Sequence, residues 1–209
     1  MANRLRNSLI YAFVTVLGVM SVLIFGLAFA KALKVTSISG MGFYGVLITW
    51  LSMIPGFCLV PYAILKKKYK INPKDVGIAR TSRKELIVIL MISVTAFLYL
   101  FAARKDITLV LLFTVLLQNL GVALSEEFFS KGILLYLAGK ITENKFMAVL
   151  LCACVFAFVF HGSGDPLINL TYRLPMGIIL GLIYLKTDNI CLPVILHLIN
   201  NLVATSALN

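Results

Sequence analysis

Long apolar stretches, each at least about as long as a membrane-crossing helix, follow one another along this chain. A bilayer core about 30 Å thick needs about 20 apolar residues in a helix. Hydrophobic residues make up 61% of the 209 residues, against about 45–50% in an ordinary soluble domain. The sequence therefore predicts an all-α fold, a polytopic transmembrane helical bundle. The stretches interpreted as crossings are residues 8–30, 40–65, 85–103, 107–139, 145–161, 168–186 and 190–207.

The stretch at residues 107–139 is longer than the others. At 1.5 Å per residue it would extend about 50 Å as one helix, too long for an untilted crossing. We expect it to bend or divide near Gly121, which gives seven or eight membrane helices in total. No long soluble linker and no fixed repeat interrupts the chain, so residues 1–209 are predicted to form a single transmembrane domain. Gly177 and Gly181 form a GxxxG pair, which favours close helix packing.

The charge distribution predicts the orientation of the chain. Lys and Arg number 19 and Asp and Glu eight, a net charge of +11, which in a soluble protein could suggest nucleic-acid binding. Here eight of the 19 cations lie in residues 66–84, between apolar stretches, where the positive-inside rule predicts a cytoplasmic loop facing anionic lipid. With Arg4 and Arg6 also inside, the N-terminus is predicted to be cytoplasmic, on a first helix that is retained. We expect membrane lipids as partners and no nucleic acid.

Three charged side chains interrupt the longest apolar stretch: Glu126, Glu127 and Lys131. Unpaired at mid-bilayer they would cost about 9 kcal/mol. A structural interpretation pairs Glu127 with Lys131, at i and i+4, near an interface. A functional one notes that neighbours on a helix point about 100° apart, so one glutamate can face a cavity while the other contacts Lys131. An apolar site disfavours an ionised carboxylate, which makes the group able to accept a proton from water near neutral pH.

The chain has two histidines, and both lie in the later apolar stretches. His161 precedes a glycine-rich break, and His197 lies one turn before Asn201 in the last stretch. Two imidazoles and the Glu126 carboxylate could hold a divalent metal such as Zn²⁺ with one position open for water. Alternatively, His197 and Asn201 could donate hydrogen bonds to a developing oxyanion while Glu126 and His161 act on the water. Both interpretations remain open.

Three motifs carry a family resemblance. Glu126-Glu127-Phe128-Phe129-Ser130-Lys131, His161, and His197-Leu198-Ile199-Asn200-Asn201 resemble, in order and spacing, the EExxxR, FxxxH and HxxxN (or HxxxB) motifs of the CPBP (CAAX protease and bacteriocin-processing, or Abi) intramembrane proteases. The resemblance covers residues 107–207, the expected protease core. It implies an integral membrane endopeptidase, in the cell membrane of a bacterium, that cleaves a hydrophobic or lipidated peptide or protein. It indicates no oligomeric state.

The resemblance also implies roles for individual residues. Glu126 would activate the hydrolytic water, His161 would help position it, and His197 with Asn201 would bind a metal or the oxyanion. Glu127 and Lys131 would support the site. Members have been described both as metalloproteases and as glutamate proteases. The implied ligands of any metal are Glu126, His161 and His197.

The chain departs from the family motifs at two positions. Lys131 stands where the family usually has Arg, which keeps the charge but loses the bidentate fork of a guanidinium. Ala157 stands where the second motif has Phe, although Phe156, Phe158 and Phe160 surround it. The lysine leaves open a catalytically impaired member that acts as a membrane scaffold or immunity factor.

Three other functions agree with fewer features of the sequence than the intramembrane protease does. A rhomboid-like serine protease would use Ser163 with His197, but a Gly-Ser-Gly at a helix break is typical of a turn. A presenilin-like aspartyl protease would use Asp165, in the sequence Gly162-Ser163-Gly164-Asp165, and needs a second intramembrane Asp. Asp75, Asp106 and Asp188 fall in polar segments instead. A transporter with a buried proton relay would predict inverted repeats, and the first hundred residues contain no matching polar pair.

Overall fold

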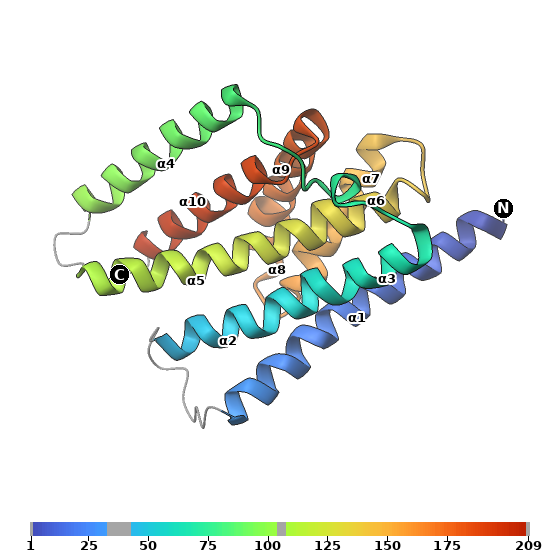
Figure 1. Ribbon diagram of the computed structural model, residues 1–209, viewed down its shortest axis with the longest axis horizontal. Coiled ribbons are helices and arrows are strands. Elements are labelled where there is room, and N and C mark those ends of the chain that lie inside the picture. Colours follow the sequence, from blue (N-terminus) through green and yellow to red (C-terminus); the bar gives the residue numbers. More distant parts are fainter. Residues whose placement is uncertain (1, 33–42, 104–107, 208–209) are drawn as a thin grey trace.

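The computed structural model describes residues 2–32, 43–103 and 108–207, and its regular elements in these ranges are helical (Figure 1). Four short segments have π-helical hydrogen bonding and one is a 3₁₀ helix. The α-helices are α1 (Ala2–Ala32), α2 (Phe43–Met53), α3 (Val60–Tyr69), α4 (Arg83–Ala103), α5 (Leu109–Glu127), α6 (Leu135–Ala138), α7 (Lys145–Val155), α8 (Pro166–Ile168), α9 (Leu174–Thr187) and α10 (Cys191–Ala207). The π-helical segments are η1 (Ile54–Leu59), η3 (Phe128–Leu134), η4 (Phe156–Phe160) and η5 (Asn169–Arg173), and the 3₁₀ helix is η2 (Pro73–Val76).

Four of the described helical runs are long and apolar enough to cross a membrane. This confirms an all-helical, membrane-embedded chain, while the count of seven or eight crossings stays a prediction. Residues 40–42 of the second predicted stretch and residue 107 of the fourth lie outside the described residues. The four runs are Asn3–Ala32, Phe43–Tyr69, Leu109–Ala138 and Pro166–Thr187, and two shorter apolar helices cover Lys145–Phe160 and Cys191–Ala204.

The helices form a layered bundle. α2 packs between α1 and α5, and α10 packs between α5 and α4, so that α4 lies at the outer edge (Figure 1). α7 and α9 pack against each other. The GxxxG prediction is confirmed there, because a Cβ atom on Gly177 would lie 3.2 Å from the Ala153 Cβ and one on Gly181 would lie 2.7 Å from Val149 Cγ1. A side chain at either position would crowd this approach of the two helices, most severely at Gly181.

The expected division of the stretch near Gly121 is wrong. α5 runs through this residue without interruption and ends at Glu127. Gly121 serves instead as a contact surface, since a Cβ there would lie 2.7 Å from the indole Nε1 of Trp50 on α2. The same indole nitrogen donates a hydrogen bond to the Leu117 carbonyl at 3.0 Å. The helical geometry changes later, at η3, directly after the two glutamates.

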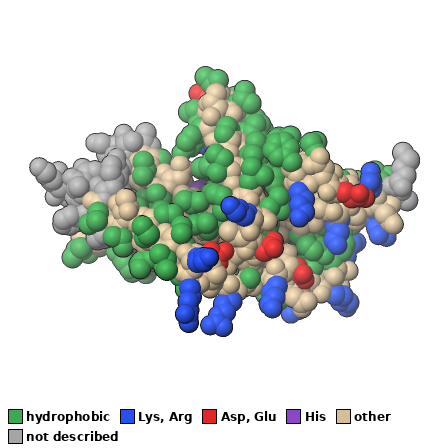
Figure 2. All heavy atoms as spheres, turned by 90° about the horizontal axis from the view of Figure 1, so that it is seen from above, with side chains coloured by type: hydrophobic (Ala, Val, Ile, Leu, Met, Phe, Trp, Pro, Cys, Tyr) green, Lys and Arg blue, Asp and Glu red, His purple; other side chains and the backbone are tan. Residues whose placement is uncertain are grey.

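The basic segment between α3 and α4 packs onto the connection between α9 and α10. The Ile190 amide donates to the Gly77 carbonyl at 3.0 Å, and the Asn189 side chain donates to the Ala79 carbonyl at 3.3 Å. Gly77 has a φ of 80° and lies against the ring of Tyr184, where a side chain would collide. In Figure 2, Lys and Arg side chains gather along one edge of the molecule, while hydrophobic side chains cover much of the remaining visible face.

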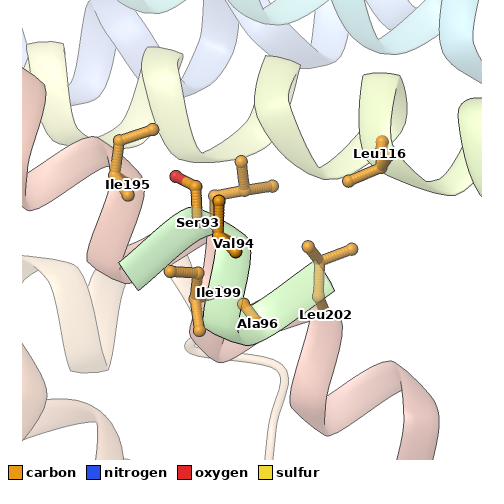
Figure 3. A pocket seen from close by; sticks show the side chains of 8 residues that line it. Ser93, Val94, Ala96, Leu116, Ile195, Ile199 and Leu202 are labelled. Carbon is orange, nitrogen blue, oxygen red and sulfur yellow. The ribbon is translucent and has the colours of Figure 1, made fainter. Parts of the chain in front are cut away.

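An apolar cavity of about 330 Å³ lies between α4, α5 and α10. Figure 3 shows side chains from these three helices converging on it. None of the predicted site residues lines this cavity, so it is distinct from the candidate site described below. Its lining residues are Ser93, Val94, Ala96, Leu116, Ile195, Leu198, Ile199 and Leu202.

Candidate active site

The two glutamates lie at the C-terminal end of α5, where the chain enters η3. Both are buried, Glu127 completely and Glu126 with 7% of its surface exposed. Their side chains take different directions, as expected for neighbours on a helix. Glu126 faces the two histidines, whereas Glu127 contacts Lys131 and His197. The two carboxylates therefore have different surroundings.

Glu127 connects α5 to α10 across 70 residues of sequence. Its Oε2 lies 3.6 Å from the Lys131 Nζ, and its Oε1 lies 2.8 Å from Nδ1 of His197. An ionised carboxylate can only accept hydrogen bonds, so the shared proton belongs to Nδ1. This interaction fixes the ring orientation of His197 and turns its Nε2 atom toward Glu126.

Glu126 faces an imidazole from each of two other parts of the chain. Its Oε2 lies 3.8 Å from Nε2 of His197 and 3.9 Å from Nε2 of His161. That oxygen is buried and has no hydrogen-bond partner among the described residues. His161 follows η4 and is partly exposed, while His197 on α10 is buried. A carboxylate oxygen between two imidazoles can accept a proton from a molecule held at the same place.

Lys131 packs against Phe156, which in turn packs against both histidines of the site. Lys131 is buried, and its ammonium donates to the Ser130 hydroxyl at 2.9 Å. The same ammonium lies 5.4 Å from the centre of the Phe156 ring, within the range of a cation–π interaction. The Phe156 ring also meets His161 and His197 edge-on, at centroid distances of 5.0 and 5.8 Å. One aromatic ring thus contacts three of the predicted site residues.

Asn169 and Arg173 were not predicted from the sequence. Asn169 is buried on η5, and its Nδ2 donates to the backbone carbonyl of His161 at 3.0 Å. Arg173 donates in turn to the Asn169 Oδ1 at 2.5 Å. A signal was present, because Arg173 is a charged side chain in an apolar stretch, where a charge is costly, and Asn169 lies one helical turn before it. This pair holds the chain at His161 in place.

Asn201 lies one turn after His197 on α10 and is half-buried. The spacing of four residues puts it on the same face of the helix as His197. Its neighbour Asn200 accepts a hydrogen bond from the Tyr172 hydroxyl, which joins α10 to η5. The position of Asn201 is compatible with the predicted contact to an oxyanion or a metal, and that role stays a prediction.

The predicted zinc ligands can be compared with the spacing that zinc requires. Ligands about 2.0–2.1 Å from a tetrahedral Zn²⁺ lie about 3.4 Å from one another. The imidazole nitrogens of His197 and His161 lie 3.8 and 3.9 Å from the Glu126 Oε2. In the described part of the chain, no group of three or more His, Cys, Asp or Glu side chains could hold a metal ion. The separations between the donor atoms are therefore larger than a zinc ion requires. Zinc binding stays a prediction, and treatment with a chelator tests it.

The residues of the rival proteases have local structural roles. Ser163 is exposed in the turn after His161. Asp165 accepts a hydrogen bond from the Leu167 amide at 2.7 Å and caps α8. Asp75 completes a capping box at η2, and Asp188 ends α9 in a left-handed conformation. Asp106 lies outside the described residues.

Comparison with known proteins agrees with the motifs. Residues 107–203 match the family model of the Rce1-like type II CAAX prenyl endopeptidases. The matched segment contains both glutamates, Lys131, both histidines and Asn201. No curated protein and no solved structure matches the chain. The family match confirms the resemblance given by the three motifs over residues 107–203 of this chain.

Proposed function

We propose that this protein is an intramembrane endopeptidase that hydrolyses a peptide bond in a membrane-embedded or lipidated peptide or protein. The observation that carries the proposal is the Glu126 Oε2 atom, which is buried, has no hydrogen-bond partner among the described residues, and faces the Nε2 atoms of His161 and His197 at 3.9 and 3.8 Å. A general base must reach its proton directly or through one water. These distances leave Glu126 and either imidazole able to bind the same water molecule.

In the proposed reaction, Glu126 removes a proton from the water as the water oxygen attacks the peptide carbonyl carbon. The carbonyl oxygen gains negative charge. In its protonated form, His197 donates its Nε2 proton to that oxygen in a hydrogen bond, and Asn201 is the second candidate donor. As the C–N bond breaks, Glu126 transfers its proton to the departing amine. One carboxylate thus serves as base and then as acid.

Glu127 and Lys131 support this reaction without touching the substrate. Glu127 accepts a hydrogen bond from Nδ1 of His197, with 2.8 Å between the nitrogen and Oε1, and thereby directs Nε2 toward the reacting atoms. Lys131 lies 3.6 Å from the other oxygen of Glu127 and balances its charge. A carboxylate that holds the remote nitrogen of a histidine plays the same orienting part in serine proteases.

The proposed setting is the cell membrane of a bacterium, with seven or eight membrane helices and a cytoplasmic N-terminus. The support is the cationic segment at residues 66–84 together with Arg4 and Arg6, all on segments that the positive-inside rule assigns to the cytoplasm. Accessibility of single cysteines to a membrane-impermeant thiol reagent, one in this segment and one near the N-terminus, tests the orientation. The predicted partners are the hydrophobic or lipidated substrate and anionic lipid.

The test is cleavage of a panel of lipidated and hydrophobic peptides by the protein purified in detergent. Glu126→Gln removes the base and keeps the shape of the side chain, so we expect turnover to fall at least about 100-fold with the helical circular dichroism unchanged. His197→Ala should lose activity as well. Glu143→Gln makes the same chemical change at an exposed carboxylate and should cleave normally. Normal cleavage by Glu126→Gln would contradict the proposed role.

The same assay separates a metal from a glutamate mechanism. The wild-type protein is treated with a chelator and then with zinc, and its zinc content is measured by elemental analysis at each step. Activity that follows the zinc content would support metal chemistry. Activity that persists after the zinc is removed would support the reaction written above. A folded wild-type protein that cleaves no member of a broad panel would favour the scaffold or immunity function.

A further inference from the structure

A second, smaller cavity of about 190 Å³ opens directly onto Glu126. Its lining residues lie on α1, at the end of α2 and in η1, at the end of α5 and at the end of η4. Among the described residues that line it, Glu126 is the one with a polar side chain. The lining consists of Val19, Val22, Leu23, Met53, Phe57, Glu126 and Phe160.

Aromatic stacking fixes one wall of this cavity. The Phe57 ring lies 4.7 Å from the Phe129 ring and 5.1 Å from the Phe160 ring, nearly parallel to both. Phe129 and Phe160 stack on each other as well, at 5.5 Å. Phe160 is followed directly by His161, so this wall is continuous with the site. A stack of three rings holds its shape because each ring restrains the other two.

Close backbone approach fixes a second part of the wall, which belongs to α1. A Cβ on Gly18 would lie 2.4 Å from the Phe129 ring, and a Cβ on Gly56 would lie 2.6 Å from Val22 Cγ2. The two glycines let α1 lie against η3 and η1, which sets the position of Val19 on the cavity surface. The cavity is therefore a shaped feature of the fold and not a gap between loosely packed helices.

The size and chemistry of the cavity indicate what it can hold. An apolar cavity of about 150 Å³ is large enough for benzene, so 190 Å³ has room for one aliphatic or aromatic side chain. Because Glu126 forms part of the wall, a side chain in the cavity belongs to a residue whose peptide bond can reach the carboxylate.

We propose, resting on the peptidase function above, that this cavity is the specificity pocket for an apolar side chain adjacent to the scissile bond. Val19 on α1 is then a specificity-determining residue. α1 and η1 lie outside the matched residues 107–203. In this chain the C-terminal half supplies the reacting groups, and the N-terminal half selects the residue beside the bond.

The test changes the volume of the pocket at Val19 and measures kcat/KM for peptides that differ only in the two residues flanking the cleaved bond. One series carries Ala, Leu or Phe on the N-terminal side of the bond, and the other carries them on the C-terminal side. Val19→Phe narrows the pocket. In one of the two series it should lower the kcat/KM of the peptides that carry Leu or Phe, relative to the peptide that carries Ala, by about tenfold or more. Val19→Ala widens the pocket, so in the same series it should raise the kcat/KM of the peptides that carry Leu or Phe relative to the peptide that carries Ala.

The control is Val16→Phe, the same substitution one turn earlier on α1, where the side chain is exposed. It should leave the side-chain preference at the wild-type value. If wild type cleaves and depends on Glu126 but neither Val19 variant changes the preference in either series, the pocket proposal is wrong and the peptidase function stands. If wild type does not cleave, the proposed function fails first. Val19→Ala keeps the experiment decisive if Val19→Phe fails to fold.

Discussion

Replacing Lys131 by methionine removes the cation from a buried ion pair and keeps an unbranched side chain of similar length. The Nζ atom lies 3.6 Å from the Glu127 Oε2, and both side chains are almost completely shielded from solvent. Two unit charges at that distance attract by about 5 kcal/mol at an effective dielectric constant of about 20. Removing one partner of a buried pair costs about 3–5 kcal/mol, because the other charge stays buried without compensation. We expect Lys131→Met to lower the free energy of unfolding by about that amount.

A double-mutant cycle isolates the interaction from the loss of packing. Glu127→Gln removes the negative charge and keeps an oxygen that can accept a hydrogen bond from Nδ1 of His197. The double variant should therefore be more stable than Lys131→Met alone, with a coupling free energy of about 2–3 kcal/mol. Unfolding is measured by titration with sodium dodecyl sulfate in mixed micelles. Fluorescence of Trp50, the only tryptophan in the chain, reports the transition together with circular dichroism.

An exposed pair provides the control. Arg4 and Glu143 lie 3.7 Å apart, almost the same separation, but their side chains are 70% and 95% exposed. Solvent screens such a pair, so the cycle on Arg4→Met and Glu143→Gln should show no measurable coupling. Effects of Glu127→Gln and Lys131→Met that add to within about 0.5 kcal/mol would refute the argument that the buried pair acts as a unit.

Two further substitutions test the surroundings of the site. Lys131→Arg supplies the planar fork of a guanidinium, so cleavage should stay at or rise above the wild-type rate in the peptide assay, and complete loss would show that the lysine itself is required. Asn169→Leu removes the donor to the His161 carbonyl, and a displaced His161 should lower kcat by about 10- to 100-fold with little change in KM. A wild-type kcat in the folded Asn169→Leu variant would contradict a positioning role for this side chain.

Part of the site could be predicted because its residues are charged while the surrounding sequence is apolar. Charged residues in an apolar stretch are costly, so Glu126, Glu127 and Lys131 were visible without a structure. The i, i+4 spacing also predicted the contact between Glu127 and Lys131, since helical geometry alone brings such residues together. Asn169 was overlooked because its contact depends on the turn that follows His161. The expected division at Gly121 was wrong for a related reason, since the glycine accommodates Trp50 from another helix.

The sequence by itself determined the membrane environment, the all-helical class and the residues that would need a functional explanation. These properties follow from hydropathy and from spacing within single helices, which are local. Only the tertiary structure decided that Glu126 faces both histidines while Glu127 holds His197, because the α5–α10 contact joins residues 70 positions apart. It also brought Val19 and Phe57 to the wall of the cavity at Glu126. Such contacts depend on how whole helices pack against one another, and no local pattern in the chain encodes them.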